Sequence, residues 1–463
     1  MFIFLLFYDI LLHMEKITTR KILTIAIPLI LQQLSLQLQL WVDRAMLGHV
    51  DTRYFSAVGN AIVPYHAITA IILAVCTGTT ILIAQSIGSG NRQDCQNYAE
   101  CSFMGNAVFP VIAFLFFFFG SEYVFKLIGV QSPILEYSAS YMRILCFSLL
   151  ILGPVTTSFS ILQGIGITKI IMLSGIVSNI LNILLDWVLI FGNWGFPAMN
   201  IEGAAYASTI SNFLSAPIAI IYVLSHKNIP FRIRIKKIFC FHWSLYKNVL
   251  KVGVPSGLEF FLWNIGNIFV VSFLNKLDIL ATGIYTLLFS IQVVPLFIYM
   301  GFANAALTLV GHKTGEDDQK QAIGVGFKCL RISLVICAVI AVIYFAFPKL
   351  ILRIFTNDRS LIDYAASFLL IIPFIMFPQA VNNVIGRGIR GMGDTRWMLY
   401  SQIFGTCLVI TLSYLLIFTA GLGLLGIFVT LLIDETVRGI INLLRFWKGR
   451  EFFFLKPFER IKG

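Results

Sequence analysis

Long apolar stretches alternate with short polar breaks along nearly the whole chain. A helix that crosses the hydrocarbon core of a bilayer needs about 20 predominantly apolar residues. By this measure we predict twelve membrane-spanning helices. They lie near residues 21–47, 54–87, 97–120, 136–161, 169–192, 202–224, 245–274, 282–310, 321–347, 361–386, 396–419 and 422–447. The predicted fold class is therefore an all-α polytopic membrane protein.

The second half of the chain repeats motifs of the first half at a constant offset of 227 residues. Pro28 recurs as Pro255, and Gly88 recurs as Gly315. Longer motifs follow the same offset: Tyr137-x-Ala139-Ser140 and Tyr364-x-Ala366-Ser367, Gly164-x-Gly166-x-Thr168-Lys169 and Gly391-x-Gly393-x-Thr395-Arg396, Leu189-Ile190-Phe191 and Leu416-Ile417-Phe418. Six spans per half make these parallel repeats about an axis along the membrane normal. Secondary transporters built in this way bind their substrate between the repeats, so the pattern favours transport.

The spans and the polar breaks define the expected domains. These are an N-lobe of six transmembrane helices over residues 15–224, a basic cytoplasmic linker over 225–244, a C-lobe of six transmembrane helices over 245–447 and a basic cytoplasmic tail over 448–463. The first residues are apolar but too few to span a bilayer. We interpret residues 1–14 as a start-site artefact or a short interfacial segment, because Met14 directly precedes a charged stretch. Met1 and Met14 both stay open as the start.

Composition excludes a soluble domain. The chain is 58% hydrophobic and 12% charged, with a mean hydropathy of +0.87, whereas soluble domains are about 25% charged. The net charge of +12 is explained by the positive-inside rule, because most Lys and Arg lie inside when both termini are cytoplasmic. We therefore expect a multi-pass protein of the cell membrane, and the densest basic cluster is interpreted as a topology signal rather than a binding patch: Lys227, Arg232, Arg234, Lys236 and Lys237.

Ionisable residues inside the spans are the candidates for function. A charge at the bilayer centre costs roughly 2.5–3.5 kcal/mol on insertion scales, so a carboxylate there needs a partner, water or a proton. Asn179, Asn182 and Asp186 lie at i, i+3 and i+7, hence on one face of the fifth span. Their oxygens suit a small cation or an exchanging proton. The alternative is a polar seam that holds helices together.

Asp43 closes a polar run in the first span, which indicates a surface facing water or a cavity. Arg44 is adjacent, but neighbouring residues on a helix point about 100° apart. At the repeat offset Asp43 aligns with Val270, and Asp186 aligns with Ser413. Because the scaffold is repeated and these carboxylates are not, we expect ion coupling to be concentrated in the first half.

Three further features of the spans remain open. Glu259 in the seventh span, which aligns with Gln32, is a separate candidate for an acidic site in the C-lobe. Pro28 and Pro255 remove an amide donor just inside the first and seventh spans, and each is either a gating hinge or a plain kink. Asp434 and Glu435 lie midway along the last span with Arg438 one turn later, which we interpret as an intramembrane ion pair; a transport role stays open.

Motifs for other chemistry are missing from the sequence. The glycines of Gly386-x-Gly388-x-x-Gly391 follow a membrane helix and not a strand, so they do not indicate a dinucleotide site. No P-loop occurs, and the eight cysteines form no C-x-x-C pair. We therefore predict a protein without cofactor, resident metal or enzymatic activity, which is driven by an ion gradient or by the gradient of its own substrate.

An ordered set of motifs resembles the multidrug and toxin extrusion (MATE) family over residues 15–450. The motifs are Pro28 with Trp41-Val-Asp43-x-x-x-x-Gly48, Ala84-Gln85-x-x-Gly88-x-Gly90, Gln163-Gly164-x-Gly166, Asn182-x-x-x-Asp186-x-x-x-Ile190-x-Gly192 and Gly203-Ala204-Ala205-Tyr206-Ala207-Ser208. Val42-Asp43 before Gly48-His49 looks most like the DNA-damage-inducible branch of that family.

The resemblance implies two six-helix lobes in a V and antiport of organic, often cationic, small molecules against Na⁺ or H⁺. It assigns the cation to the residues that match the family's N-lobe site, Asp43, Asn182, Asp186 and Ser208. Other branches use an acidic residue about eight positions after the proline of the seventh span, where this chain has Trp263. Glu259 is only four positions after Pro255, which weakens a C-lobe coupling site. We expect a monomer in the lipid bilayer with no nucleic-acid partner.

Two other functions fit the sequence less well than antiport. A flippase for lipid-linked saccharides, from the same wider superfamily, would line its cavity with basic residues, but the first-half spans hold almost no interior Lys or Arg. An intramembrane enzyme or receptor is disfavoured by the duplication and by the lack of a nucleophile–base pair. The sequence does not identify the transported compounds. It does not identify the coupling ion either, because the same oxygens can bind Na⁺ and H⁺.

Overall fold

Helices account for all regular structure in residues 18–277 and 279–448, which the computed structural model describes. The all-α expectation is therefore confirmed. The predicted start segment 1–14 and the basic tail beyond Lys448 lie outside the described residues.

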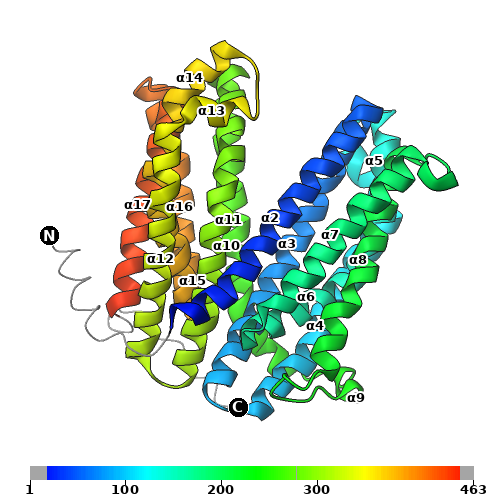
Figure 1. Ribbon diagram of the computed structural model, residues 1–463, viewed down its shortest axis with the longest axis vertical. Helices are drawn as coiled ribbons and strands as arrows, with labels where there is room; N and C mark the ends of the chain where they lie inside the picture. Colours follow the sequence, from blue (N-terminus) through cyan, green and yellow to red (C-terminus); the bar gives the residue numbers. More distant parts are fainter. Residues whose placement is uncertain (1–17, 278, 449–463) are drawn as a thin grey trace. The chain divides into compact units, whose positions relative to one another are not determined.

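The first repeat forms six spans in the predicted order (Figure 1). Its helices are α2 (Thr19–Val50), α3 (Thr52–Gly88), α4 (Arg92–Leu127), α5 (Ile134–Leu145) with α6 (Ser148–Ile165), α7 (Thr168–Phe191) and α8 (Asn200–Ser225). A short 3₁₀ turn, η1 (Asn193–Gly195), joins α7 to α8, and one helical turn, α9 (Ile235–Ile238), lies in the connection to the second repeat. The fourth span is thus divided into two helices.

The second repeat follows the same plan. Its helices are α10 (Trp243–Leu277), α11 (Ile279–Gly315), α12 (Gln319–Ala346), α13 (Pro348–Arg353), α14 (Arg359–Leu369) with α15 (Ile372–Gly391), α16 (Thr395–Tyr414) extended by the π-helical turn η2 (Leu415–Thr419), and α17 (Leu424–Lys448). Its fourth span is also divided, with a bend of 47° between α14 and α15.

The local geometry repeats as well as the helix order. Asn91 caps the start of α4 through the amide of Asp94, and Asp318 caps the start of α12 through the amide of Gln321. These two caps are 227 residues apart and use the side-chain types that satisfy free N–H groups at helix starts. A Cβ added at Gly164 would lie 3.0 Å from the carbonyl of Thr80, and one at Gly391 would lie 2.6 Å from that of Leu307. Both pairs of positions follow the same offset, so glycine permits the same close helix crossing in each repeat.

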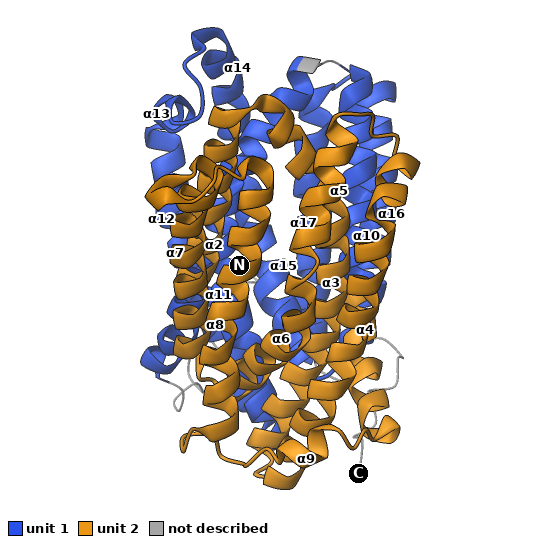
Figure 2. Ribbon diagram, turned by 90° about the vertical axis from the view of Figure 1, so that its right-hand side faces the viewer, with its two compact units in different colours: residues 1–30, 258–463 blue, residues 31–257 orange. Residues whose placement is uncertain are grey.

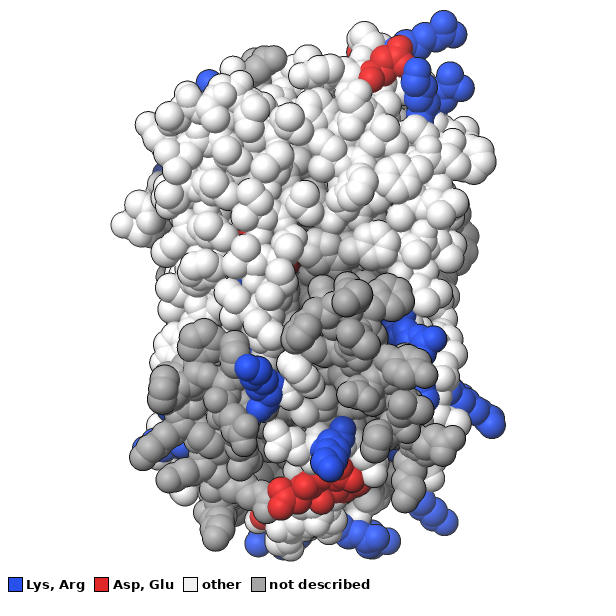
Figure 3. Space-filling view, turned by 90° about the vertical axis from the view of Figure 1, so that its left-hand side faces the viewer, with Lys and Arg blue, Asp and Glu red and all other residues white. Residues whose placement is uncertain are grey.

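The helices have the length and composition of membrane spans. In the described part of the chain, ten are long and apolar enough to cross a bilayer by themselves, and the bent pair α14–α15 makes eleven. The remaining predicted span, α17, has 25 residues but carries Asp434, Glu435 and Arg438 in its middle. On the face shown in Figure 3 the charged side chains gather mainly towards the two ends and leave a largely uncharged band between them, as expected for a surface in lipid.

The chain forms two compact units (Figure 2). They exchange the starts of their first helices. Unit 2 comprises Leu31–Gly257, and unit 1 combines the chain through Ile30 with the chain from Leu258 onward. Within unit 1, a Cβ on Gly301 of α11 would lie 3.1 Å from the carbonyl of Ala26. Within unit 2, a Cβ on Gly253 would lie 2.8 Å from the carbonyl of Val75. Small residues therefore hold the first turns of each repeat against the second helix of the other repeat.

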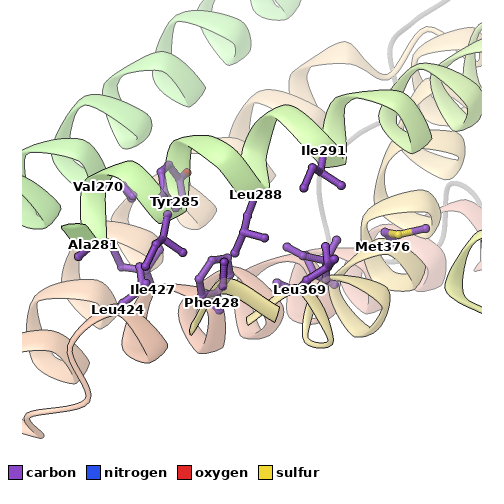
Figure 4. Packing of buried hydrophobic residues seen from close by; sticks show 14 of the residues in the cluster. Val270, Ala281, Tyr285, Leu288, Ile291, Leu369, Met376, Leu424, Ile427 and Phe428 are labelled. Atoms are coloured by element: carbon purple, nitrogen blue, oxygen red, sulfur yellow. The ribbon is translucent and has the colours of Figure 1, made fainter. Parts of the chain in front are cut away.

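Each unit has its own apolar core. In unit 2 the core includes Leu47, Phe117, Met142 and Ile190. In unit 1 most of it comes from α10, α11, α14, α15 and α17, and Figure 4 shows Leu288, Leu369 and Phe428 packed together there. Val270, which aligns with Asp43, lies in this cluster.

Candidate cation site in the first repeat

Four of the predicted residues meet inside unit 2. Asp43 comes from α2, Asn182 and Asp186 come from α7, and Ser208 comes from α8. The tight α7–α8 connection brings the residues of α7 close to Ser208 of α8, because Gly192 adopts a left-handed conformation with φ +73°. A Cβ on Gly203 of α8 would lie 2.6 Å from the carbonyl of Leu189, so only glycine allows this approach of α8 to α7.

Asn182 joins the other members of the site. With its amide nitrogen turned to Asp43, it donates hydrogen bonds of 3.1 and 3.3 Å to the two carboxylate oxygens. Its amide oxygen then accepts from the hydroxyl of Ser208 at 3.3 Å and from the backbone amide of Ser208 at 3.1 Å. An amide can also be turned by half a rotation, because its oxygen and nitrogen are nearly the same size. Asn182 can therefore offer either a donor or an oxygen ligand to whatever binds beside Asp43.

Asp186 is the most unusual member of the site. It is only 1% exposed, and in the described part of the chain neither of its carboxyl oxygens receives a hydrogen bond from a donor. The carboxyl of Asp43 is its neighbour. Two adjacent carboxylates in a poorly hydrated site repel each other, and the repulsion is relieved when a cation binds beside them or when a proton neutralises one of them. This pair is therefore suited to take up one positive charge.

Two further residues complete the site, and sequence reasoning did not assign them to it. Gln39 donates to Asp43 at 3.2 Å and also contacts the side chain of Asn182. It lies one turn before Asp43 on α2, so helical spacing could have identified it. Tyr141 of α5 is buried beside the carboxyls of Asp43 and Asp186 and the hydroxyl of Ser208. No spacing connects α5 to the other helices, so only the fold reveals Tyr141.

Asn179 is buried on the predicted face of α7, two turns before Asp186. Its amide donates to the hydroxyl of Ser35 at 2.9 Å. In the hydrogen bonds of the described residues it joins α7 to α2 and does not touch the two carboxyls. This contact is of the kind expected from the alternative, a polar seam between helices, and a role of Asn179 in coupling stays a prediction.

Glu259 forms an ion pair with Arg390 inside unit 1. Arg390 of α15 contacts both carboxylate oxygens of Glu259 on α10, with its Nε 3.2 Å from Oε2. Arg387 lies one turn before Arg390 and is close enough to interact electrostatically with both Arg390 and Glu259. Glu259 therefore has a cation of its own within the protein.

The charges of the last span also compensate one another. Arg438 donates through Nε to Asp434 at 2.8 Å, and one of its amino groups lies 3.6 Å from Glu435. It also donates to Gln402 at 2.9 Å, and Asn382 donates to Glu435 at 2.8 Å. The ion pair predicted for Arg438 is confirmed. Asp434, Glu435 and Arg438 line a pocket of unit 1 together with Trp263, Tyr285 and Phe289. The pocket has a volume of about 600 Å³, which includes the space open to solvent.

Pro28 and Pro255 lie at equivalent places in their helices. Both α2 and α10 run on through the proline without a break in the helix. Each helix passes from one compact unit to the other two residues later, between Ile30 and Leu31 and between Gly257 and Leu258.

A comparison with known families identifies the fold and the duplication together. The model of the MatE family matches residues 28–188 and again residues 255–415, which are the two repeats at their offset of 227. The chain belongs to this family. The MATE family consists of transporters, which agrees with the prediction of a membrane transporter and not an enzyme.

Individual MATE relatives match over nearly the whole chain. A probable multidrug resistance protein NorM of Thermotoga maritima is 28% identical over 436 residues, covering 93% of this chain and 92% of its own. An uncharacterized transporter of Bacillus subtilis, YisQ, is 28% identical over 415 residues, covering 88% of this chain and 89% of its own. An outward-facing multidrug resistance MATE transporter of the MOP superfamily superposes with a TM-score of 0.86 at 20% identity, covering 94% of this chain and 98% of its own. The assignment to the DNA-damage-inducible branch stays a prediction.

Proposed function

We propose that this MATE transporter exports organic, often cationic, compounds in exchange for Na⁺ or H⁺. The observation that carries the proposal is the buried carboxyl of Asp186, which lacks a donor and lies beside Asp43. The names of the relatives, which refer to multidrug resistance, support the class of cargo.

Asp43, Asn182, Asp186 and Ser208 are the proposed ion site. A proton would be held by one of the two carboxyls. A Na⁺ would be held by carboxyl oxygens, by the Ser208 hydroxyl and by the amide oxygen of Asn182, which are hard ligands of the kind that small cations prefer. Gln39 and Tyr141 orient these groups. Since Asn182 can turn either end of its amide to Asp43, the site accommodates both ions.

The ion drives export because it binds one conformation better than the other. In the outward-open state the ion reaches the carboxyls and displaces the cargo, and in the inward-open state it leaves. Entry of one positive charge down a potential of 100 mV supplies roughly 2.3 kcal/mol. We further propose that α2 and α10 bend near Pro28 and Pro255, since each helix leaves its compact unit two residues after the proline.

The topology belongs to the same proposal. The N-lobe of residues 15–224 and the C-lobe of residues 245–447 enter the cell membrane from the cytoplasm, and both termini stay there, as the distribution of Lys and Arg indicates. The protein acts as a monomer, because both repeats needed for one transport pathway are present in a single chain.

The test is export of ethidium by purified protein in proteoliposomes, with the Na⁺ and H⁺ gradients dissipated separately. We expect one of the two gradients to drive export and Asp186→Asn to abolish the driven component. The matched control is Asp363→Asn, since Asp363 is an exposed carboxylate paired with Lys349 on α13. Driven export that survives in Asp186→Asn under the same gradient would overturn the assignment of the ion site.

A further inference from the structure

The connection between the repeats has an unusual composition. Residues 226–242 join the end of α8 to the start of α10 and contain three Lys, two Arg and no Asp or Glu. Because α8 and α10 are both membrane spans, this connection lies at the surface of the bilayer. We call residues 226–243 the linker surface, so that Trp243 at the start of α10 is included.

One side of the linker surface is fixed to unit 2. Glu100 of α4, whose side chain is 6% exposed, accepts from Nε of Arg234 at 3.0 Å and from its backbone amide at 2.8 Å. Ile229, Phe231 and Ile233 alternate with outward residues and are buried. The linker is therefore held in one conformation by an ion pair and by three apolar side chains.

The other side presents apolar and basic groups together. Ile235, Phe239 and Trp243 are 60%, 73% and 60% exposed. Lys227, Arg232, Lys236 and Lys237 are exposed beside them, and the ion pairs among the described residues do not include these four. Glu100 neutralises Arg234, so four positive charges are left to face outward.

We propose that the linker surface binds the headgroups of anionic phospholipids. A topology signal requires only positive charge, so it does not explain why Phe239 and Trp243 are exposed. Aromatic rings are stable at the level of the headgroups, where one end is apolar and the other is hydrated. A cluster of at least four basic residues directly beside a membrane span attracts anionic lipids within a Debye length. The combination fits a lipid surface and does not depend on the ion site of the first repeat.

A soluble polyanion or free phosphate would match the charge but not the apolar side chains. Either one would leave Ile235, Phe239 and Trp243 in water, at the cost of their exposed apolar area. These alternatives therefore become outcomes of the test.

A natural cysteine allows the test in the full chain. Cys240 lies in the linker surface and is exposed, as is Cys407, whereas the other six cysteines are buried. The Cys407→Ser protein is labelled at Cys240 with a fluorophore and placed in phosphatidylcholine nanodiscs. Equal mole fractions of nitroxide-labelled phosphatidylglycerol or phosphatidylcholine are then added as quenchers. The difference in quenching reports which lipid is enriched at the linker.

We expect phosphatidylglycerol to be enriched at Cys240 about five-fold over phosphatidylcholine at low salt, and less at 300 mM NaCl. Arg232→Gln/Lys236→Gln/Lys237→Gln should lose this preference. The charge-matched control Lys276→Gln/Arg353→Gln/Arg359→Gln should keep it.

Equal quenching by both lipids, an equal loss in both variants, or removal of the preference by 10 mM inorganic phosphate at constant ionic strength would each overturn the proposal. Transport is not measured, so failure here is separate from failure of the antiport proposal.

Discussion

The two repeats share one scaffold but differ at the positions of Asp43 and Asn182. In unit 2, Asp43 and Asp186 lie side by side, and the amide of Asn182 and the hydroxyl of Ser208 are near them. In unit 1, the positions that correspond to Asp43 and Asn182 by the offset are Val270 and Val409, both in the apolar core. The carboxylates of unit 1 lie elsewhere and are compensated by Arg438 and Arg390.

The difference separates an ion site from an ion pair. A carboxylate with an arginine beside it is already neutralised and has little need of an ion from solution. The pair in unit 2 has no such partner in the ion pairs of the described residues, so a bound cation or proton would relieve the repulsion between its two carboxyls. We therefore expect substitutions in unit 1 to affect stability and those in unit 2 to affect coupling.

The largest expected effect is on the stability of unit 1. Arg438→Gln leaves Asp434 and Glu435 buried without a cation, which should lower the free energy of unfolding by about 3–5 kcal/mol. Unfolding by denaturant in detergent micelles measures this loss. Arg53→Gln, which removes an arginine from the exposed pair with Asp51, is the control and should have no measurable effect. A stable Arg438→Gln protein with altered coupling would mean that unit 1 also binds an ion.

The second effect concerns the affinity of the ion site. Asn182→Ala removes hydrogen bonds to the Asp43 carboxylate, and bonds to charged groups contribute about 1.5–3 kcal/mol. We expect the concentration of coupling ion needed for half-maximal export to rise by about 10- to 100-fold. Asn179→Ala is the matched control, because Asn179 bonds to Ser35 and not to the carboxyls. Similar shifts in both variants would show that Asn182 only holds helices together.

A smaller effect is expected for the ion pair of α10 and α15. Glu259→Gln removes the partner of Arg390, a partly exposed residue that lies close to Arg387. The free energy of unfolding should therefore fall by about 1 kcal/mol. The ion dependence of export should stay unchanged. Double substitution with Arg390→Gln should restore part of the stability. A change in ion dependence without a change in stability would instead make Glu259 a coupling residue.

The smallest effect is expected at Tyr141. Tyr141→Phe keeps the ring and removes the hydroxyl beside the two carboxyls and Ser208, and the loss of one neutral hydrogen bond corresponds to about a three- to ten-fold change. The half-saturating ion concentration measures it. Tyr65→Phe is the control, because its hydroxyl bonds to Ser148 and, in the hydrogen bonds of the described residues, not to the members of the ion site. No difference between the two variants would remove Tyr141 from the ion site.

The sequence predicted the fold closely because two strong patterns agree. Apolar runs define the spans, and the repeat offset pairs each span of the first half with a span of the second half. Each divided fourth span therefore corresponds to one predicted segment. The exchanged starts of α2 and α10 could not be predicted, since apolar periodicity does not show which neighbour a helix packs against. The change of unit inside each helix depends on close contacts at Gly253 and Gly301.

Helical spacing predicted the part of the candidate site whose residues share a helix. Asn182 and Asp186 follow helical spacing on α7, whereas Tyr141 lies on another helix with no such signal. Glu259 illustrates the opposite difficulty. The sequence shows that Glu259 is a carboxylate within a span. Its partner Arg390 is 131 residues away along the chain, so only the fold shows that the charge of Glu259 is neutralised.

The exchange of helix starts has a consequence for how the protein is assembled during synthesis. The opening turns of α2 leave the ribosome before the chain from Leu258 onward exists, although they pack in the unit formed by that later chain. The amino-terminal half therefore cannot reach its native state alone and must wait for the other half. Two separately expressed fragments, cut within the connection after α8, should be unstable singly and regain a native complex when they are co-produced.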